Sequence, residues 1–122
     1  MTPPRDVELP LPRNYLRPCL LLLLAEGTSH GYELLEQVRV LGMATTDAAG
    51  VYRCLRAMDE EGLVQSQWEP STTGPARRVY SLTAAGGDRL QAATEQLAES
   101  VNAVTYFLGR YAAVADGKVA QQ

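Results

Sequence analysis

The sequence predicts a mainly α-helical fold with one two-stranded β-hairpin and a long C-terminal helix. Three observations lead to this class. Apolar residues recur at helical spacing over residues 16–62, side chains alternate with a period of two over residues 63–68 and 77–82, and residues 84–115 are alanine-rich with a helical apolar pattern. A chain of 122 residues is expected to form one domain, to which a second copy could add stability.

The two ends of the chain are expected to lie outside the folded part. Residues 1–13 are predicted to be a flexible arm, because their four prolines favour extended or irregular backbone. Residues 116–122 are predicted to be a disordered tail. The longest apolar run, residues 19–24, is far shorter than the roughly 20 residues of a membrane span, and the polar N-terminal residues do not resemble a signal peptide. We therefore expect a cytoplasmic protein.

Two helices are predicted in the first third of the chain. The first covers Leu16–Glu26, with Gly27 as its C-terminal stop. Leucine occupies the five successive positions 20–24, which predicts that this helix is buried on nearly all sides. The second covers about His30–Leu41. Its predicted apolar stripe consists of Tyr32, Leu35 and Val38.

The third predicted helix starts at Thr46 or Asp47, stops at Gly62, and has an unusual order of charges. Its sequence over residues 48–64, AAGVYRCLRAMDEEGLV, places two arginines near the start and three carboxylates at the end. A surface helix prefers the reverse order, which complements the helix dipole. A requirement other than helix stability therefore set these charges. The predicted inward face consists of Val51, Cys54, Leu55 and Met58, and the outward face of Ala49, Tyr52, Arg53 and Arg56.

The hairpin that follows completes a known arrangement. Its two strands are joined by the polar loop PSTTGPA at residues 70–76. Three helices followed by a hairpin with a basic second strand is the order of a winged helix-turn-helix, whose third helix enters the DNA major groove while the hairpin, or wing, contacts the flanking backbone. The N-terminal half of that helix faces DNA, which explains its charge order. We predict a mainly α winged helix-turn-helix with a two-stranded β wing over residues 14–83.

The predicted C-terminal helix, residues 84–115, carries a heptad-like apolar pattern. Its apolar residues recur at steps of seven, four, three, four and three. So long a stripe has no partner within so short a chain, which predicts that the helix is a dimerisation helix that pairs with a second copy. The stripe, called the seam below, consists of Leu90, Leu97, Val101, Val104, Leu108 and Tyr111.

Four stretches resemble the PadR family of bacterial transcriptional regulators: LLLLLAEGTSHGYEL, VYRCLRAMDEEGLV, TGPARRVYSLTAAG and the seam helix. The His-Gly-Tyr-Glu and Tyr-x-Leu-Thr-x-x-Gly runs around a Tyr-x-x-Leu helix form a specific combination. The resemblance implies a homodimeric winged-helix repressor whose terminal helices form the dimer and often line a cavity for an aromatic or amphipathic effector. Residues 47–50, Asp-Ala-Ala-Gly, depart from the Ser-Pro-Gly-Thr that is usual in the family. The resemblance therefore does not imply which residues of this chain contact DNA bases. Asp47 is either a helix cap or an acceptor for cytosine.

The residues expected at DNA lie on the third helix, the wing and the start of the second helix. Arg77 and Arg78 alternate faces, so one of them, preferably Arg77, is expected to reach DNA while the other covers the apolar surface of the wing. Tyr52 either packs on the first helix or contacts a phosphate, and His30 is either a helix cap or a phosphate contact. The expected set is His30, Thr46, Ala49, Gly50, Tyr52, Arg53, Arg56, Thr73, Arg77 and Arg78.

The remaining aromatic residues have two interpretations each. Trp68 is expected to fill the gap between wing and core, with stacking on an effector as the alternative. A mostly apolar effector site with a few hydroxyls is expected, which suits a planar aromatic or amphipathic molecule. The alternative is that its rings only complete the dimer core. The expected site consists of Tyr15, Tyr106, Phe107 and Tyr111.

Composition argues against several other classes of protein. A single histidine excludes a histidine-rich metal site, and Cys19 and Cys54 lie in apolar helical contexts that predict core thiols. The sequence shows no paired nucleophile and base and no glycine-rich phosphate loop, so we expect no enzyme activity and no cofactor. The net charge of −3 supports one rival, a winged-helix module that binds protein rather than DNA.

Overall fold

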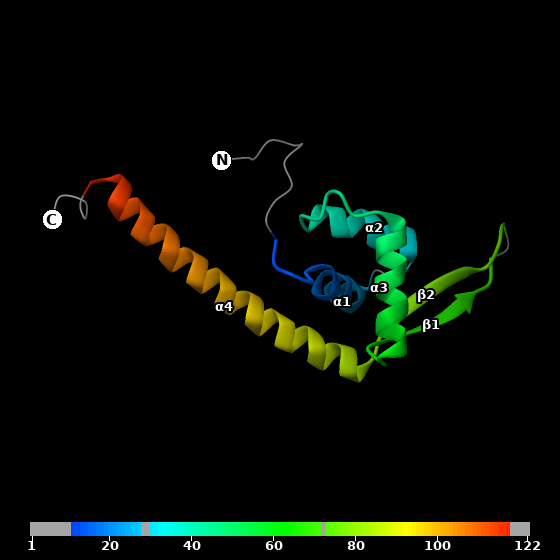
Figure 1. The fold of residues 1–122 in the computed structure, drawn as a ribbon. Helices are drawn as coiled ribbons and strands as arrows, with labels where there is room; N and C mark the ends of the chain where they lie inside the picture. Colours follow the sequence, from blue (N-terminus) through cyan, green and yellow to red (C-terminus); the bar gives the residue numbers. More distant parts are fainter. Residues whose placement is uncertain (1–10, 28–29, 72, 118–122) are drawn as a thin grey trace. The chain divides into compact units, whose positions relative to one another are not determined.

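The computed structural model describes residues 11–27, 30–71 and 73–117, and most of the predicted arm and tail lie outside these ranges. Within them the chain forms helices and one hairpin in the predicted order (Figure 1). The mainly α-helical fold with a two-stranded wing and a long C-terminal helix is confirmed. The elements are α1 (Leu16–Glu26), α2 (Gly31–Val40), α3 (Ala48–Glu60), β1 (Val64–Glu69), β2 (Arg77–Leu82) and α4 (Ala84–Ala115).

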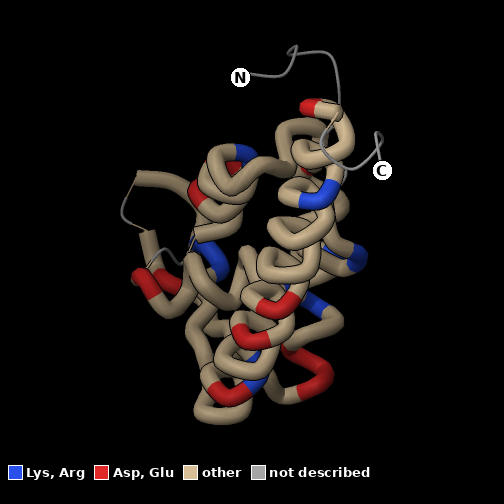
Figure 2. The backbone as a smooth tube through the Cα atoms, turned by 90° about the vertical axis from the view of Figure 1, so that its left-hand side faces the viewer, with Lys and Arg blue, Asp and Glu red and all other residues tan. Residues whose placement is uncertain are grey.

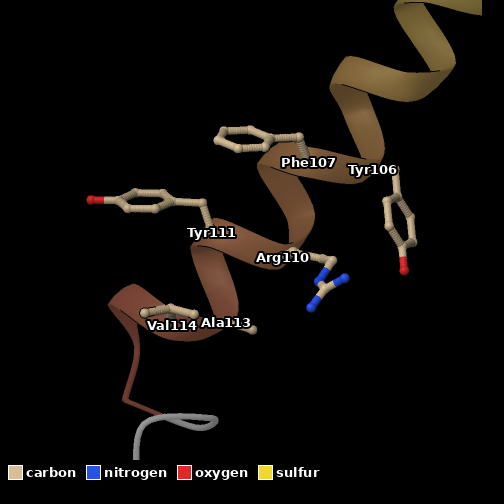
Figure 3. A pocket seen from close by; sticks show the side chains of 6 residues that line it. All are labelled: Tyr106, Phe107, Arg110, Tyr111, Ala113 and Val114. Carbon is tan, nitrogen blue, oxygen red and sulfur yellow. The ribbon is translucent and has the colours of Figure 1, made fainter.

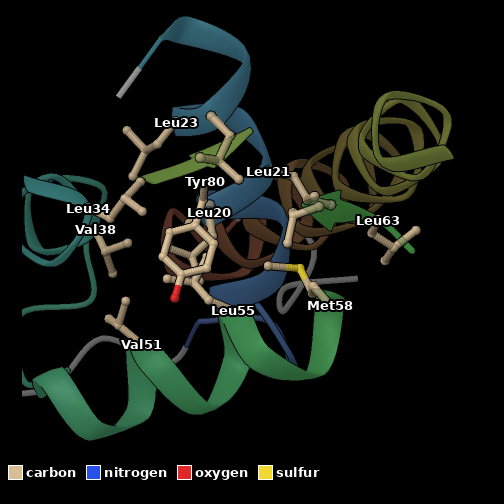
Figure 4. Packing of buried hydrophobic residues seen from close by; sticks show 13 residues of the cluster. Leu20, Leu21, Leu23, Leu34, Val38, Val51, Leu55, Met58, Leu63 and Tyr80 are labelled. Atoms are coloured by element: carbon tan, nitrogen blue, oxygen red, sulfur yellow. The ribbon is translucent and has the colours of Figure 1, made fainter. Parts of the chain in front are cut away.

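The core lies where α1, α2 and α3 meet the base of the hairpin (Figure 4). Its fully buried side chains come from all of these elements. The prediction that α1 is buried on nearly all sides is wrong at Leu22, which is 37% exposed. Four of its five successive leucines are buried, but the three-sided contact with α2, α3 and β2 leaves one strip of α1 uncovered. The largest fully buried residues are Leu20, Leu21, Leu34, Val38, Val51, Leu55, Met58 and Val64.

The inward face of α2 differs from the predicted stripe. Leu34 and Val38, one helical turn apart, are fully buried, Leu35 is half-buried, and Tyr32 is 54% exposed. Tyr32 lies two residues from Leu34, which is about 200° around the helix, so it points away once Leu34 enters the core. The spacing of residues 32, 35 and 38 is helical, but contact with α1 and α3 selected the neighbouring stripe.

Both cysteines are free thiols, as expected for core residues. Cys19 is buried on α1, and Cys54 is half-buried against the same core. Burial raises the pKa of both thiols, because the thiolate would lose its hydration there. Burial therefore disfavours the nucleophilic thiolate form of both residues.

The hairpin is antiparallel, with a register that runs from Val64 opposite Leu82 to Glu69 opposite Arg77. An isolated bridge between His30 and Val79 connects the start of α2 to β2. Thr83 then joins the hairpin to α4: its hydroxyl donates to the Gly62 carbonyl over 2.7 Å and accepts from the Gly86 amide over 3.0 Å.

Contacts divide the chain into two units, with the boundary between Gln91 and Ala92 inside α4. The first unit contains α1, α2, α3, the hairpin and the first turns of α4. The second contains the rest of α4, whose apolar side chains are largely exposed. No helix in the described ranges is both long enough and apolar enough to cross a lipid bilayer.

Candidate nucleic-acid interface

Helix α3 is capped by Asp47. Its Oδ1 accepts a hydrogen bond of 2.8 Å from the Gly50 amide, and its backbone is extended, as at a helix N-cap. Of the two interpretations of Asp47, the structure contains the cap. The carboxylate also lies at the positive end of the helix dipole.

The two faces of α3 have the predicted compositions. Val51, Leu55 and Met58 have no exposed surface, and Cys54 is half-buried beside them. The burial of one face holds the opposite face in place on the surface. That outward face consists of the exposed residues Ala49, Tyr52, Arg53 and Arg56, with Gly50 half-buried at its start.

The acidic end of α3 has structural partners that the sequence did not reveal. Arg17 of α1 donates from both terminal nitrogens to the Glu61 carboxylate just after α3, with 2.9 Å between Nη1 and Oε1. These hydrogen bonds lower the pKa of Glu61. Asp59 accepts a 2.9 Å hydrogen bond from Ser66 of β1. The carboxylates thus connect α3 to α1 and to the wing.

Tyr52 packs on the start of α2, not on the first helix. Its ring lies over Gly31, where a Cβ atom would come within 2.6 Å of Tyr52 Cε1. The ring remains 39% exposed. The absence of a side chain at Gly31 therefore lets the hydroxyl end of Tyr52, on the outward face of α3, approach α2 closely.

His30 forms the N-cap of α2 through its backbone, which accepts from the Leu34 amide, whereas its side chain makes no cap hydrogen bond. Two carboxylates flank the imidazole instead. Nδ1 lies 3.3 Å from Glu33 Oε1, and Nε2, which has no hydrogen-bond partner among the described residues, lies 3.5 Å from Glu69 Oε1. This pair of carboxylates would repel a phosphate, so His30 is the least favourable member of the expected DNA-contact set.

The two wing arginines lie on opposite faces of the hairpin. Arg78 donates from Nε and Nη2 to Ser66 Oγ over 3.1 and 3.0 Å, and its guanidinium lies 5.4 Å from the centre of the Trp68 ring. Arg77 is exposed opposite Glu69. Thr73 is exposed in the loop between the strands. Arg78 is thus the arginine that covers the apolar surface of the wing.

The expectation that Trp68 fills the gap between wing and core is wrong, because its side chain is 62% exposed. Val64, Ser66 and Trp68 share one face of β1, and their burial falls in that order from buried to half-buried to exposed. The hairpin extends beyond the core, so the face that is inward at Val64 has no core to meet at Trp68.

A hollow of about 380 Å³ lies between α3 and the wing. Sequence reasoning missed it, because the residues of α3 and of the hairpin that line it are brought together only by folding. Burial raises the pKa of Tyr80, one of these residues. This space, called the α3–wing hollow below, is lined by Tyr52, Arg56, Asp59, Trp68, Arg78 and Tyr80.

Charges of both signs are spread along the chain (Figure 2), so any basic surface must come from local arrangement rather than from overall composition. The described residues contain no group of three or more His, Cys, Asp or Glu side chains that could hold a metal ion.

The seam residues do not share one environment. Leu90 packs against the core of the first unit, where the first turns of α4 meet it, and Leu97 is half-buried. Leu90 therefore differs from the others, because its own chain already covers part of it. The exposed seam residues are Val101, Val104, Leu108 and Tyr111.

A second hollow, of about 450 Å³, lies along the end of α4. Phe107 and Tyr111 project to one side of the helix, and Tyr106 and Arg110 to another, with the guanidinium 5.9 Å from the centre of the Tyr106 ring (Figure 3). Tyr15, which was expected to share this site, lies in the first unit, where its hydroxyl is 3.5 Å from the Leu41 carbonyl. The hollow is lined by Tyr106, Phe107, Arg110, Tyr111, Ala113 and Val114, all of α4.

Comparison with known proteins decides the family. The model of the "Transcriptional regulator PadR-like family" matches residues 20–92, which is more than half of the chain. The chain belongs to the PadR-like family of transcriptional regulators. These residues include all of α2, α3 and the hairpin, so the family signal covers the outward face of α3 and the α3–wing hollow. The assignment places this PadR-like protein among regulators rather than enzymes.

Solved structures share its fold. A PadR-like transcriptional regulator from Bacillus cereus is 25% identical over 76% of this chain and 90% of its own, with a TM-score of 0.69. A Streptococcus transcriptional regulator is also 25% identical, over 75% and 90%, with a TM-score of 0.67. A PadR family regulator from Clostridium difficile, 24% identical over 78% and 99%, has a TM-score of 0.70 and supports the fold alone. No curated protein matches the sequence of this PadR-like protein.

Proposed function

We propose that this PadR-like protein is a homodimeric repressor that binds operator DNA through α3 and the wing. The observation that carries the proposal is the outward face of α3. Tyr52, Arg53 and Arg56 are exposed there, while the opposite face of the helix is buried in the core at Val51, Leu55 and Met58. A helix held so firmly from behind presents its side chains at fixed positions, as reading the major groove requires.

In this proposal residues 14–83 bind DNA and residues 84–115 pair two copies. Support for pairing comes from the second unit, where apolar side chains of α4 are exposed on a helix that its own unit does not cover. An exposed apolar stripe of this length is typical of a protein interface. A dimer would also place two recognition helices at a fixed spacing, which an operator with two half-sites matches.

We further propose that a planar aromatic or amphipathic effector releases the operator. The end of α4 supplies aromatic walls, hydroxyls and one guanidinium around about 450 Å³. A hollow lined by one helix is open on the other side, so a second copy would have to complete it. The effector would act only if it bound more tightly to a dimer whose recognition helices miss the operator spacing.

The test of DNA binding starts with genomic fragments that the purified protein retains. These fragments are titrated at several salt concentrations with wild type, Arg56→Ala and Arg77→Ala. A residue that contacts only phosphate lowers the salt slope by about 1, whereas a base contact discriminates by about 1–3 kcal/mol between sequences. We expect Arg77→Ala to lower the salt slope without changing sequence preference.

The same titration separates DNA binding from protein binding. The rival function, a winged-helix module that binds protein, is supported by the net charge of −3. If purified wild-type protein retains no genomic fragment even at low salt, the rival is favoured. If Arg77→Ala changes sequence preference and leaves the salt slope unaltered, the wing does not have the proposed role.

A further inference from the structure

Trp68 is an exposed aromatic side chain of the wing. It is the single tryptophan of the chain, it is 62% exposed, and it lies on the part of β1 that extends beyond the core. A single exposed ring is common on protein surfaces, but this one is paired with a guanidinium and lines a hollow with side chains of α3.

A chain of contacts holds this ring and its cation in place. Asp59 of α3 accepts from the Ser66 hydroxyl over 2.9 Å, and Ser66 Oγ accepts two hydrogen bonds from Arg78. The Arg78 guanidinium in turn lies over Trp68, 5.4 Å from the ring centre. These contacts with α3 hold the Arg78 and Trp68 side chains in position before any partner binds. Binding would therefore remove less side-chain conformational entropy.

The chemistry of the α3–wing hollow selects an anionic partner with an apolar body. Arg56 and Arg78 contribute two positive charges, and Asp59 contributes one negative charge that the Ser66 hydroxyl already engages. The tyrosine rings and Trp68 supply apolar walls. A sugar-phosphate unit has both required properties, because its phosphate oxygens are anionic and its deoxyribose ring is apolar.

We propose that the α3–wing hollow receives one sugar-phosphate unit of the DNA backbone, with Trp68 packed against the deoxyribose and Arg56 facing the phosphate. The inference rests on the proposed function, because Tyr52 and Arg56 belong both to the hollow and to the outward face of α3. The hollow is thus continuous with the surface that is proposed to enter the major groove.

The fluorescence of Trp68 reports whether the α3–wing hollow is occupied, because the chain has no other tryptophan that contributes to the emission. Emission and acrylamide quenching are measured while a random-sequence DNA duplex is added at low salt, since a backbone contact does not depend on sequence. Binding of the duplex is followed independently by the anisotropy of a dye on the DNA. We expect emission to change and quenching to fall with the same midpoint as the anisotropy.

Variants test whether the contact contributes to affinity. Trp68→Ala should weaken duplex binding by about tenfold or more, the equivalent of burying an aromatic side chain, whereas Trp68→Phe should retain most of the affinity. Tyr32→Ala is the matched control, because Tyr32 is a similarly exposed aromatic residue of the same unit outside the hollow. Circular dichroism confirms that each variant is folded.

Three results would overturn the inference. If the duplex binds but Trp68 quenching is unaltered and Trp68→Ala binds like wild type, the hollow is not a backbone contact, and the proposed DNA binding stands. If dAMP alone protects Trp68 at the concentrations at which duplex DNA does, the ligand is a free nucleotide. If wild type binds no DNA in any assay, the proposed function fails, and the backbone contact fails with it.

Discussion

Gly31 of α2 lies against the hydroxyl end of the Tyr52 ring of α3, so close that a Cβ on Gly31 would lie 2.6 Å from Tyr52 Cε1 and 2.7 Å from Cζ. This relationship links the first residue of α2 to the proposed recognition surface. Because the Tyr52 side chain is partly exposed, it can move away from a Cβ introduced at position 31, whereas the backbone of α2 cannot.

Gly31→Ala is therefore expected to displace Tyr52 rather than to unfold the protein. If Tyr52 contacts a phosphate, its loss removes a hydrogen bond to a charged group, and DNA affinity should fall about tenfold or more. Anisotropy titrations with the retained genomic fragments measure this effect. In a Tyr52→Phe background, which already lacks the hydroxyl, Gly31→Ala should cause little further loss; wild-type affinity in the single variant would contradict the role given to Tyr52.

Glycine is required more strictly at position 86 than at position 31, because the atom closest to Gly86 is a backbone carbonyl oxygen, which cannot move aside as a side chain can. A Cβ at this position would overlap the Leu63 carbonyl oxygen and lie 2.8 Å from Leu82 Cδ1. Gly86→Ala should lower the free energy of unfolding by about 1–3 kcal/mol, as measured by chemical denaturation. Gly87→Ala is the matched control: its Cβ would make only an ordinary 4.0 Å contact, so it should be neutral or stabilising by up to about 1 kcal/mol. Equal effects at both positions would show that the first turn of α4 does not pack against Leu63 and Leu82 in this way.

The ion pair between Arg17 and Glu61 predicts a pH dependence of stability. Its hydrogen bonds lower the pKa of Glu61 from the ordinary 4.5 in the folded state. The stabilisation is therefore present above about pH 4.5 and is lost as the pH falls through the lower, folded-state pKa. Glu61→Gln should lower the melting temperature slightly at pH 7, and the difference from wild type should vanish in acid. Glu60→Gln, which removes the same charge one residue earlier, should not reproduce this pattern.

The proposed dimer is tested by charges on the seam. Leu97→Glu with Val104→Glu places like charges in the proposed interface and should yield monomers in light scattering, with weaker DNA binding. Gln96→Glu with Ala103→Glu keeps the same spacing one position away, off the seam, and should leave the dimer intact. A dimer that persists with the seam charges would show that these residues do not form the interface.

Local sequence signals were sufficient for the order of the elements and for their bounds to within one or two residues. The predicted first helix, Leu16–Glu26, has the observed bounds, because Gly27 ends it in the left-handed conformation that glycine adopts readily. The third helix begins where Asp47 can cap it, and the strands begin where the period changes to two. Each of these features depends on a few neighbouring residues, so the sequence alone contains them.

Only the tertiary structure decided which faces meet. Helical spacing placed Tyr32 on a stripe, but contact with α1 and α3 buried Leu34 instead. Alternation placed Trp68 on the inward face of β1, yet the core ends before the hairpin does and leaves that ring exposed. The α3–wing hollow joins residues that are up to about 28 positions apart, such as Tyr52 and Tyr80. Periodicity states which residues share a side of one element, whereas exposure depends on where other elements stop, and that information lies in contacts between residues distant in the chain.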